Sequence, residues 1–256
     1  MRMEDLDPDR SRNEYREAAF EDLHWLGIRW DEGPDVGGAY GPYEQGLRHD
    51  FYLAAWKKLR EGGFLYPCKC SRKDLASTLS APHENMSRGQ EPLDDEPVYP
   101  GTCRPTNENG RATETLSANA VDPNGMHWRF RVPDGETIEF EDLNLGRRRF
   151  VAGVDFGDFV VWRRDGVPSY QLACVADDAA MGITEVVRGA DLLKSTARQI
   201  LLNRALGFAS PAWFHCELVA DEAGKRLAKR HDALSVRALR QRGLTPEEVL
   251  SSDLKY

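Results

Sequence analysis

The chain has 256 residues, of which 41% are hydrophobic and 30% charged, and its formal net charge is −8 at pH 7. This composition is sufficient to bury a core in one large domain or two smaller ones, and it excludes disorder of the whole chain. The acidic balance argues against a general nucleic-acid binder, although clusters of Lys and Arg occur.

Export and membrane insertion are not expected. No run of apolar residues approaches the length of a membrane span, and the opening residues, Met1 to Asp5, do not resemble a signal peptide. We therefore expect a cytoplasmic protein. The five cysteines are an odd number in a chain without an export signal, so metal ligation or plain burial is expected rather than a disulfide framework.

Two helices are predicted in the first quarter of the chain. Apolar residues recur at helical spacing from Ser11 to Leu26, and Gly27 follows where a helix would end. After a loop rich in Gly and Pro, a second helix is expected from Gln45 to Glu61, ending at Gly62.

Residues 66–108 lose this periodicity and are rich in Pro, Ser, Asp and Cys, which is typical of a small excursion from the main fold. Thiolates close in sequence can bind zinc tetrahedrally, and the metal would supply the folding energy that the excursion lacks. A phenolate can serve as the fourth ligand, with His83 as its rival. Spacing alone leaves open that the cysteines are incidental. The candidate ligands are Cys68, Cys70, Tyr99 and Cys103.

The second half alternates strands and helices. Strands facing solvent on one side are predicted at Trp128–Val132 and Thr137–Phe140, and more deeply buried strands at Phe159–Trp162 and Tyr170–Ala176. A helix from Ala190 to Leu206, closed by Gly207, and a short apolar run from Trp213 to Val219 follow. Cys174 and Cys216 are interpreted as core residues. The alternation favours an α/β fold with a parallel sheet.

Several motifs appear in a consistent order along the chain. RMEDLD at Arg2–Asp7 could by itself cap the following helix. It is followed by WLGIRWDEGPD, GPYEQGLRHDFY, RRDGVPSYQLACVADDAAMGITEVVRGADLL and KRLAKRHDAL, which ends at Leu234. Together these motifs resemble the glutamyl-tRNA and glutaminyl-tRNA synthetase family over nearly the whole chain. The resemblance implies a Rossmann-like class I aminoacyl-tRNA synthetase catalytic core with a small zinc-binding insertion.

The resemblance also implies a glutamate site. Glu4 matches the acidic residue that receives the ammonium group of glutamate, and Tyr170 matches the tyrosine lining the amino-acid pocket. Arg188 matches the arginine that binds the side-chain carboxylate, a task suited to a planar guanidinium. The alternative for Arg188 is a structural ion pair with Asp191 or Glu185.

The basic stretch near the C-terminus resembles the lysine-bearing loop of class I synthetases. Lys229 matches the lysine assigned to ATP, and Arg226 and Arg230 flank it. Cations here would stabilise the triphosphate as pyrophosphate departs, with Mg²⁺ accompanying ATP. Ala228 stands where the family often has serine, which removes a hydroxyl but no charge.

The domain organisation implied by the resemblance is a core of residues 1–65 and 109–220, a zinc-binding insertion at 66–108 and a C-terminal segment at 221–256. In the family, a first strand and a HIGH-type ATP loop precede the RxEDxD motif, with which this sequence begins. We therefore expect the printed chain to lack half of its ATP site and to expose a neighbouring strand edge.

Within the family, CxC followed by YxxxC resembles the branch of glutamyl-queuosine tRNA(Asp) synthetases. The implied function is activation of glutamate by ATP and transfer of the glutamyl group to queuosine in tRNA(Asp), by a monomer. One alternative is a fragment of an ordinary glutamyl-tRNA synthetase. The other is a catalytically dead, zinc-stabilised remnant that binds RNA through clusters such as Arg147–Arg149.

Overall fold

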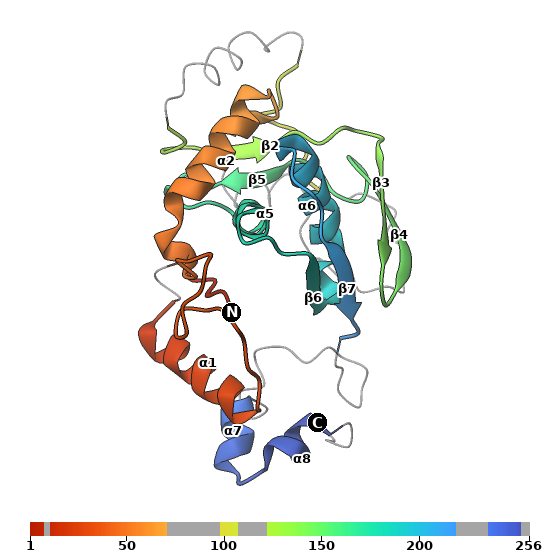
Figure 1. The fold of residues 1–256 in the computed structure, drawn as a ribbon. Helices are drawn as coiled ribbons and strands as arrows, with labels where there is room; N and C mark the ends of the chain where they lie inside the picture. Colours follow the sequence, from red (N-terminus) through yellow and green to blue (C-terminus); the bar gives the residue numbers. More distant parts are fainter. Residues whose placement is uncertain (8–10, 71–97, 107–121, 219–234, 252–256) are drawn as a thin grey trace. The chain divides into compact units, whose positions relative to one another are not determined.

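The described parts of the chain form two compact units. The computed structural model describes residues 1–7, 11–70, 98–106, 122–218 and 235–251 (Figure 1). Unit 1 comprises Met1–Arg48 and the described residues from Glu217 onward, and unit 2 comprises His49–Cys216. Of the described helices, none has the length and apolar character that crossing a membrane requires. The domain boundaries expected from the sequence remain a prediction.

Within the described residues, unit 2 begins with a helix, and two further α-helices lie among its strands. Its elements in chain order are α2 (His49–Glu61), β1 (Leu65–Cys68), β2 (His127–Phe130), β3 (Thr137–Asp142), β4 (Gly146–Val151), β5 (Phe159–Trp162), α5 (Tyr170–Ala180), β6 (Glu185–Gly189), η2 (Ala190–Leu192), α6 (Leu193–Leu206) and β7 (Ala212–Cys216). Gly207 ends α6 in the left-handed conformation with φ 68°, as the sequence predicts.

The strands of unit 2 form two separate sheets. One is antiparallel with the order β1-β2-β5, and the other has the order β4-β3-β7-β6. Among the strand pairs of the described residues, β3–β7 and β6–β7 are parallel and the others antiparallel, so the expectation of a parallel sheet is correct for just part of the second sheet. The β3–β4 pair is a hairpin closed by a tight turn, whereas the antiparallel pairs β1–β2 and β2–β5 join strands far apart in the sequence. Within the described residues, β4 and β6 form the edges of this sheet.

The prediction of a strand at Tyr170–Ala176 is wrong, because these residues form the first part of α5. The hydroxyl of Ser169 accepts a hydrogen bond from the Leu172 backbone N–H and caps the helix. All residues from Leu172 to Asp177 are buried, so the sequence lacks the polar face that marks an amphipathic helix. A fully buried helix and a buried strand look alike over such a short apolar run.

The structure differs from the sequence-based expectations at several further positions. β2 is buried at three of its four positions rather than on one face. Cys216 is exposed at the end of β7, contrary to the expected core position, whereas Cys174 is buried, in a helix. β1, β4 and β6 were not predicted, because β1 and β6 are short and the Arg-rich sequence of β4 has the appearance of a basic surface cluster.

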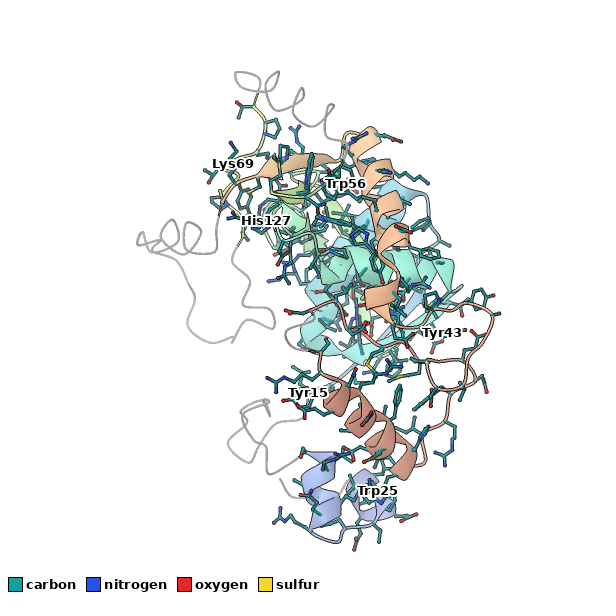
Figure 2. The ribbon with its side chains drawn as sticks, turned by 90° about the vertical axis from the view of Figure 1, so that its left-hand side faces the viewer. Tyr15, Trp25, Tyr43, Trp56, Lys69 and His127 are labelled. Atoms are coloured by element: carbon teal, nitrogen blue, oxygen red, sulfur yellow. The ribbon has the colours of Figure 1, made fainter. Side chains whose placement is uncertain are left out.

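Three tryptophans connect α2 to the antiparallel sheet. The Trp56 ring of α2 meets Trp128 of β2 edge-on at a centroid distance of 5.0 Å, and Trp162 of β5 lies 6.5 Å away. All three side chains are fully buried, and Figure 2 labels Trp56 on its helix. Aromatic contacts of this geometry add to the free energy gained from burying the rings.

A buried hydrogen bond joins α2 to α5. The Tyr52 hydroxyl donates to Asp177 at 2.9 Å, and neither residue has exposed surface. Replacing Tyr52 with Phe is expected to reduce the free energy of unfolding by about 1.5–3 kcal/mol, because the buried carboxyl loses a donor. Urea denaturation measures this change. The control is Tyr15→Phe, which removes a hydroxyl from a residue that is 58% exposed; equal effects of the two substitutions would contradict the prediction.

Unit 1 contains α1 (Asn13–Trp25), η1 (Gln45–Leu47), α7 (Val236–Gln241) and α8 (Pro246–Leu250). The N-terminal segment pairs with the residues before η1: the Met3 N–H donates to the Tyr43 carbonyl at 2.8 Å, and Met3 accepts from the Gln45 N–H at 3.0 Å. α7 packs on α1, where Arg237 forms an ion pair with Glu21 at 2.7 Å. The backbone hydrogen bonds of Met3 thus place the N-terminal acidic motif beside η1.

Candidate functional site

The N-terminal acidic motif lines a pocket in unit 1. Glu4 is half exposed and pairs with Arg2 at 3.2 Å. The pocket has a volume of about 180 Å³, and its lining comprises Met3, Glu4, Asp5, Ser11, Arg12, Asn13, Tyr15 and Arg16. A carboxylate at the rim of such a pocket is suited to receive a cationic group.

The two adjacent acidic residues have different environments. The Asp5 carboxylate accepts a hydrogen bond from the Gly46 backbone N–H at 2.8 Å and so ties the N-terminal segment to η1. Helix α1 begins at Asn13 with Arg12 as its N-cap, and no side chain caps it. The N-cap residue is therefore not one of the acidic residues, and stabilisation of the helix N-terminus by the acidic motif stays an alternative interpretation.

Arg188 lies on β6 of unit 2, where it is held by neutral partners. Its Nε–H donates to His215 Nε2 at 3.3 Å, and its Nη2 donates to Thr196 Oγ1 at 2.5 Å. The guanidinium also lies over the Trp213 ring, 4.8 Å from the centroid. In the described part of the chain Arg188 forms no ion pair, so the alternative pairing with Asp191 or Glu185 is not formed there.

The two hydrogen bonds use one edge of the Arg188 guanidinium and leave a second edge available to a ligand. Nε and Nη2 form the side edge, which the two hydrogen bonds use. The end edge is formed by Nη1 and Nη2, and Nη1 has no hydrogen bond to any of the residues described. An end edge of this kind donates two parallel hydrogen bonds to a carboxylate.

The partner of Arg188 is a buried His–Asp pair that sequence reasoning missed. His215 Nδ1 lies 2.5 Å from Asp142 Oδ2, and both side chains have no exposed surface. Burial and the charge of Arg188 lower the pKa of His215. Burial acts to raise the pKa of Asp142, but the bonds from His215 and from backbone N–H groups outweigh it and lower that pKa. At neutral pH the pair is therefore a carboxylate and a neutral imidazole.

Tyr170 begins α5, and 37% of its surface is exposed. The adjacent Gln171 donates from Nε2 to Ser195 Oγ at 2.9 Å, and Ser195 precedes Thr196, which holds Arg188. The start of α5 is thus linked to the first turn of α6 beside Arg188. Glu4 belongs to unit 1, whereas Tyr170 and Arg188 belong to unit 2.

Cys68, Cys70 and Cys103 come together in unit 2, with their Sγ atoms all within 4.8 Å of one another. The Sγ atoms of Cys70 and Cys103 are 3.5 Å apart. The Tyr99 hydroxyl lies 3.5 Å from the Cys68 sulfur and 3.6 Å from the Cys70 sulfur. Figure 2 labels Lys69, which separates Cys68 and Cys70. The four candidate ligands therefore form one cluster.

The cluster is partly buried, and a cation lies against it. Arg129 donates from Nε to Cys68 Sγ at 3.3 Å, and its guanidinium lies 3.7 Å from the centroid of the Tyr99 ring. Burial raises the pKa of Cys70 to about 11 and also raises that of the Tyr99 hydroxyl. For Cys103, burial acts in the same direction, but hydrogen bonds from the Lys69 backbone N–H and neighbouring side chains lower the pKa.

The remaining predicted site residues lie outside the described residues. These are Arg226, Lys229, Arg230 and the rival ligand His83. The sequence offered a weak signal for the His–Asp pair: Asp142 ends a strand just before a turn, and its Oδ1 accepts from the N–H groups of Asn144 and Leu145. Such an Asx turn suggests a structural aspartate, but it does not identify the partner across the sheet.

Comparison with known proteins places the chain among the synthetases. Residues 1–252 match the family described as tRNA synthetases class I (E and Q), catalytic domain. The Glutamyl-Q tRNA(Asp) synthetase of Symbiobacterium thermophilum is 51% identical over 98% of this chain and 73% of its own length. The protein of the same name from Nitratidesulfovibrio vulgaris is 46% identical over 95% of this chain and 71% of its own length.

A structural relative has the same fold. The crystal structure of a glutamate tRNA ligase from Elizabethkingia meningosepticum, in complex with its amino acid, matches 90% of this chain with a TM-score of 0.71 and 27% identity. The present chain spans 44% of that protein. The class I synthetase fold expected from the motifs is thus confirmed.

Proposed function

This chain belongs to the class I tRNA synthetases (E and Q), and we propose that it activates glutamate with ATP and transfers the glutamyl group to queuosine at the wobble position of tRNA(Asp). The observation that carries the choice of acceptor is the 51% and 46% identity to two proteins named Glutamyl-Q tRNA(Asp) synthetase. A fragment of an ordinary glutamyl-tRNA synthetase is the second candidate, favoured by the likeness to a solved glutamate tRNA ligase.

From the resemblance we propose that Glu4, Tyr170 and Arg188 each contribute to the binding of glutamate. The end edge of the Arg188 guanidinium would bind the side-chain carboxylate of glutamate, and the absence of a competing ion pair in the described residues supports this role. Glutamine would lose the charge pairing, and its amide NH₂ would face a donor. Glu4 would receive the ammonium group, while Tyr170 would form a wall of the pocket.

The reaction has two balanced steps. A carboxylate oxygen of glutamate attacks the α-phosphorus of ATP, forming glutamyl-adenylate and releasing pyrophosphate. A hydroxyl of the acceptor then attacks the acyl carbon, AMP leaves with the electrons of the broken C–O bond, and the hydroxyl proton passes to the phosphate of AMP or to water. Lys229, with Arg226 and Arg230, would neutralise the charge on the departing pyrophosphate, with Mg²⁺ bound to ATP. Most of the catalysis would come from alignment of the reacting atoms, with little need for a general base.

A structural zinc ion fits the cysteine cluster. In a tetrahedral site with Zn–S bonds of about 2.3 Å, the sulfur atoms are roughly 3.75 Å apart, and an oxygen ligand at about 2.0 Å lies roughly 3.5 Å from each sulfur. The 3.5 Å between the Cys70 and Cys103 sulfurs, and the 3.5 and 3.6 Å from the Tyr99 hydroxyl to the Cys68 and Cys70 sulfurs, are close to these edges. Cys68, Cys70, Tyr99 and Cys103 would hold the ion, which would supply folding energy to this part of the chain.

The test is glutamate-dependent exchange of labelled pyrophosphate into ATP without tRNA. By resemblance, the queuosine branch performs this exchange without tRNA and ordinary glutamyl-tRNA synthetases do not. We expect this exchange to proceed in the absence of tRNA. If exchange appears only when tRNA is added, the second candidate is correct. If it appears in no condition, the chain is a catalytically inactive remnant.

The acceptor is tested with labelled glutamate and two forms of tRNA(Asp) that differ only in queuosine. We expect label on the modified form and none on the unmodified transcript. Equal labelling of both forms would contradict queuosine as the acceptor.

A further inference from the structure

The second hydrogen-bonding layer behind Arg188 is built from elements far apart in the sequence. Arg188 and His215 are register partners on the parallel strands β6 and β7, which lie side by side in Figure 1. Parallel register partners project to the same face of a sheet. Asp142 ends β3 on the other side of β7, and Thr196 lies in the first turn of α6. Three elements therefore converge behind one guanidinium.

The donors and acceptors of this layer allow one tautomer of His215. Its Nε2 faces the Arg188 Nε–H at 3.3 Å, a group that can only donate, so Nε2 must carry a lone pair. The Thr196 hydroxyl lies 3.0 Å from the same nitrogen and also reaches the Leu192 carbonyl at 3.2 Å, so it does not decide the tautomer. The proton then lies on Nδ1 and is donated to the Asp142 carboxylate. In the other tautomer, the Nδ1 lone pair would face a carboxylate and the Nε2–H would face the Arg188 Nε–H.

The Asp142 carboxylate is itself held rigidly. It accepts from the backbone N–H groups of Asn144, Leu145 and His215 at 3.1, 2.9 and 3.3 Å. In addition, the Asn144 side chain donates to the His215 carbonyl at 2.8 Å. The carboxylate, the imidazole and the guanidinium thus form a chain in which each group has a single orientation.

We propose that Asp142 and His215 are positioning residues for specificity: by fixing the acceptor that holds the Arg188 side edge, they aim its end edge at the side-chain carboxylate of glutamate. The inference rests on the proposed function of Arg188. His215 and Asp142 would not touch the substrate, and their effect would be confined to binding of glutamate and its discrimination from glutamine.

The central variant is Asp142→Asn. The asparagine amide can donate to Nδ1, which would move the His215 proton to Nε2 and set a donor against the Arg188 Nε–H. We expect the KM for glutamate to rise about 10–100-fold, below the roughly 10⁴-fold loss in kcat when an equivalent change disturbs proton transfer in a catalytic triad. The KM for ATP and the kcat should stay within about threefold of the wild type, since Arg188 acts on glutamate binding.

A second variant supplies the rescue. In Asp142→Asn/His215→Gln, the glutamine Oε1 can again accept from Arg188 without depending on a tautomer, so the KM for glutamate should recover by at least about fivefold relative to Asp142→Asn alone. The control is Glu139→Gln, which removes a carboxylate from the same strand, where it pairs with the exposed Arg147. This control should leave the KM for glutamate unchanged.

A direct readout separates this inference from the proposed function. Long-range ¹H–¹⁵N NMR of the histidine side chains should show His215 protonated at Nδ1 in the wild type and at Nε2 in Asp142→Asn. A wild-type His215 protonated at Nε2 overturns the inference, and so does an unchanged glutamate KM in an active Asp142→Asn enzyme. Absence of glutamate-dependent exchange in the wild type overturns the proposed function instead, and the NMR result still decides the tautomer.

Discussion

Replacing Arg188 with alanine is expected to lower kcat/KM for glutamate by about 10³-fold. The substitution would leave the substrate carboxylate without its charged partner, and truncation of one member of a buried charge pair costs about 2–5 kcal/mol. Each 1.4 kcal/mol corresponds to about a factor of ten in rate. Pyrophosphate exchange at varied glutamate concentration measures the loss.

Arg188→Lys should fall between the wild type and Arg188→Ala. Lysine retains the charge but cannot donate to His215 and Thr196 on one edge and to a carboxylate on another. The matched control is Arg147→Ala on β4, because the Arg147 side chain is 73% exposed and pairs with Glu139 at the surface. Retention of wild-type kcat/KM for glutamate by Arg188→Ala would show that this residue does not bind the substrate carboxylate.

Replacing Cys68 or Cys103 with serine is expected to lower zinc affinity by more than about 100-fold and to reduce the melting temperature. Structural zinc contributes apparent binding free energies of about 10–16 kcal/mol in zinc-finger peptides, so loss of one thiolate removes a large part of the coupled folding energy. Competition with a chromophoric chelator measures the affinity, and metal analysis gives the zinc content per chain.

Cys216→Ser is the matched control, because this exposed thiol lies at the end of β7 and outside the cysteine cluster. It should retain one zinc ion and the wild-type melting temperature. A wild-type protein that contains no zinc, and whose melting temperature does not change with a chelator, would remove the metal from the proposal.

Local patterns in the sequence were sufficient to predict several helices and strands. The apolar periodicity and the terminal glycines of α1, α2 and α6 predicted these helices to within a few residues, since each has a sequence marker of its end. β5 was predicted with its bounds, Phe159–Trp162. The CxC and YxxxC spacings indicated a cluster that the structure forms, because most of its geometry lies within short stretches of chain. The order of the motifs was sufficient to identify the synthetase family.

Features that depend on contacts between residues distant in the sequence could be seen only in the tertiary structure. Helix α5 has no polar face to reveal its period, because α2 and α6 bury it, so only the packed structure distinguishes it from a strand. Asp142 and His215 are 73 residues apart and meet because β3 and β7 are neighbouring strands. The family resemblance identified Arg188 as a candidate, but only the folded sheet shows that His215 and Thr196 bind the side edge of its guanidinium. Strand register is a property of the assembled sheet, and no local spacing in the chain encodes it.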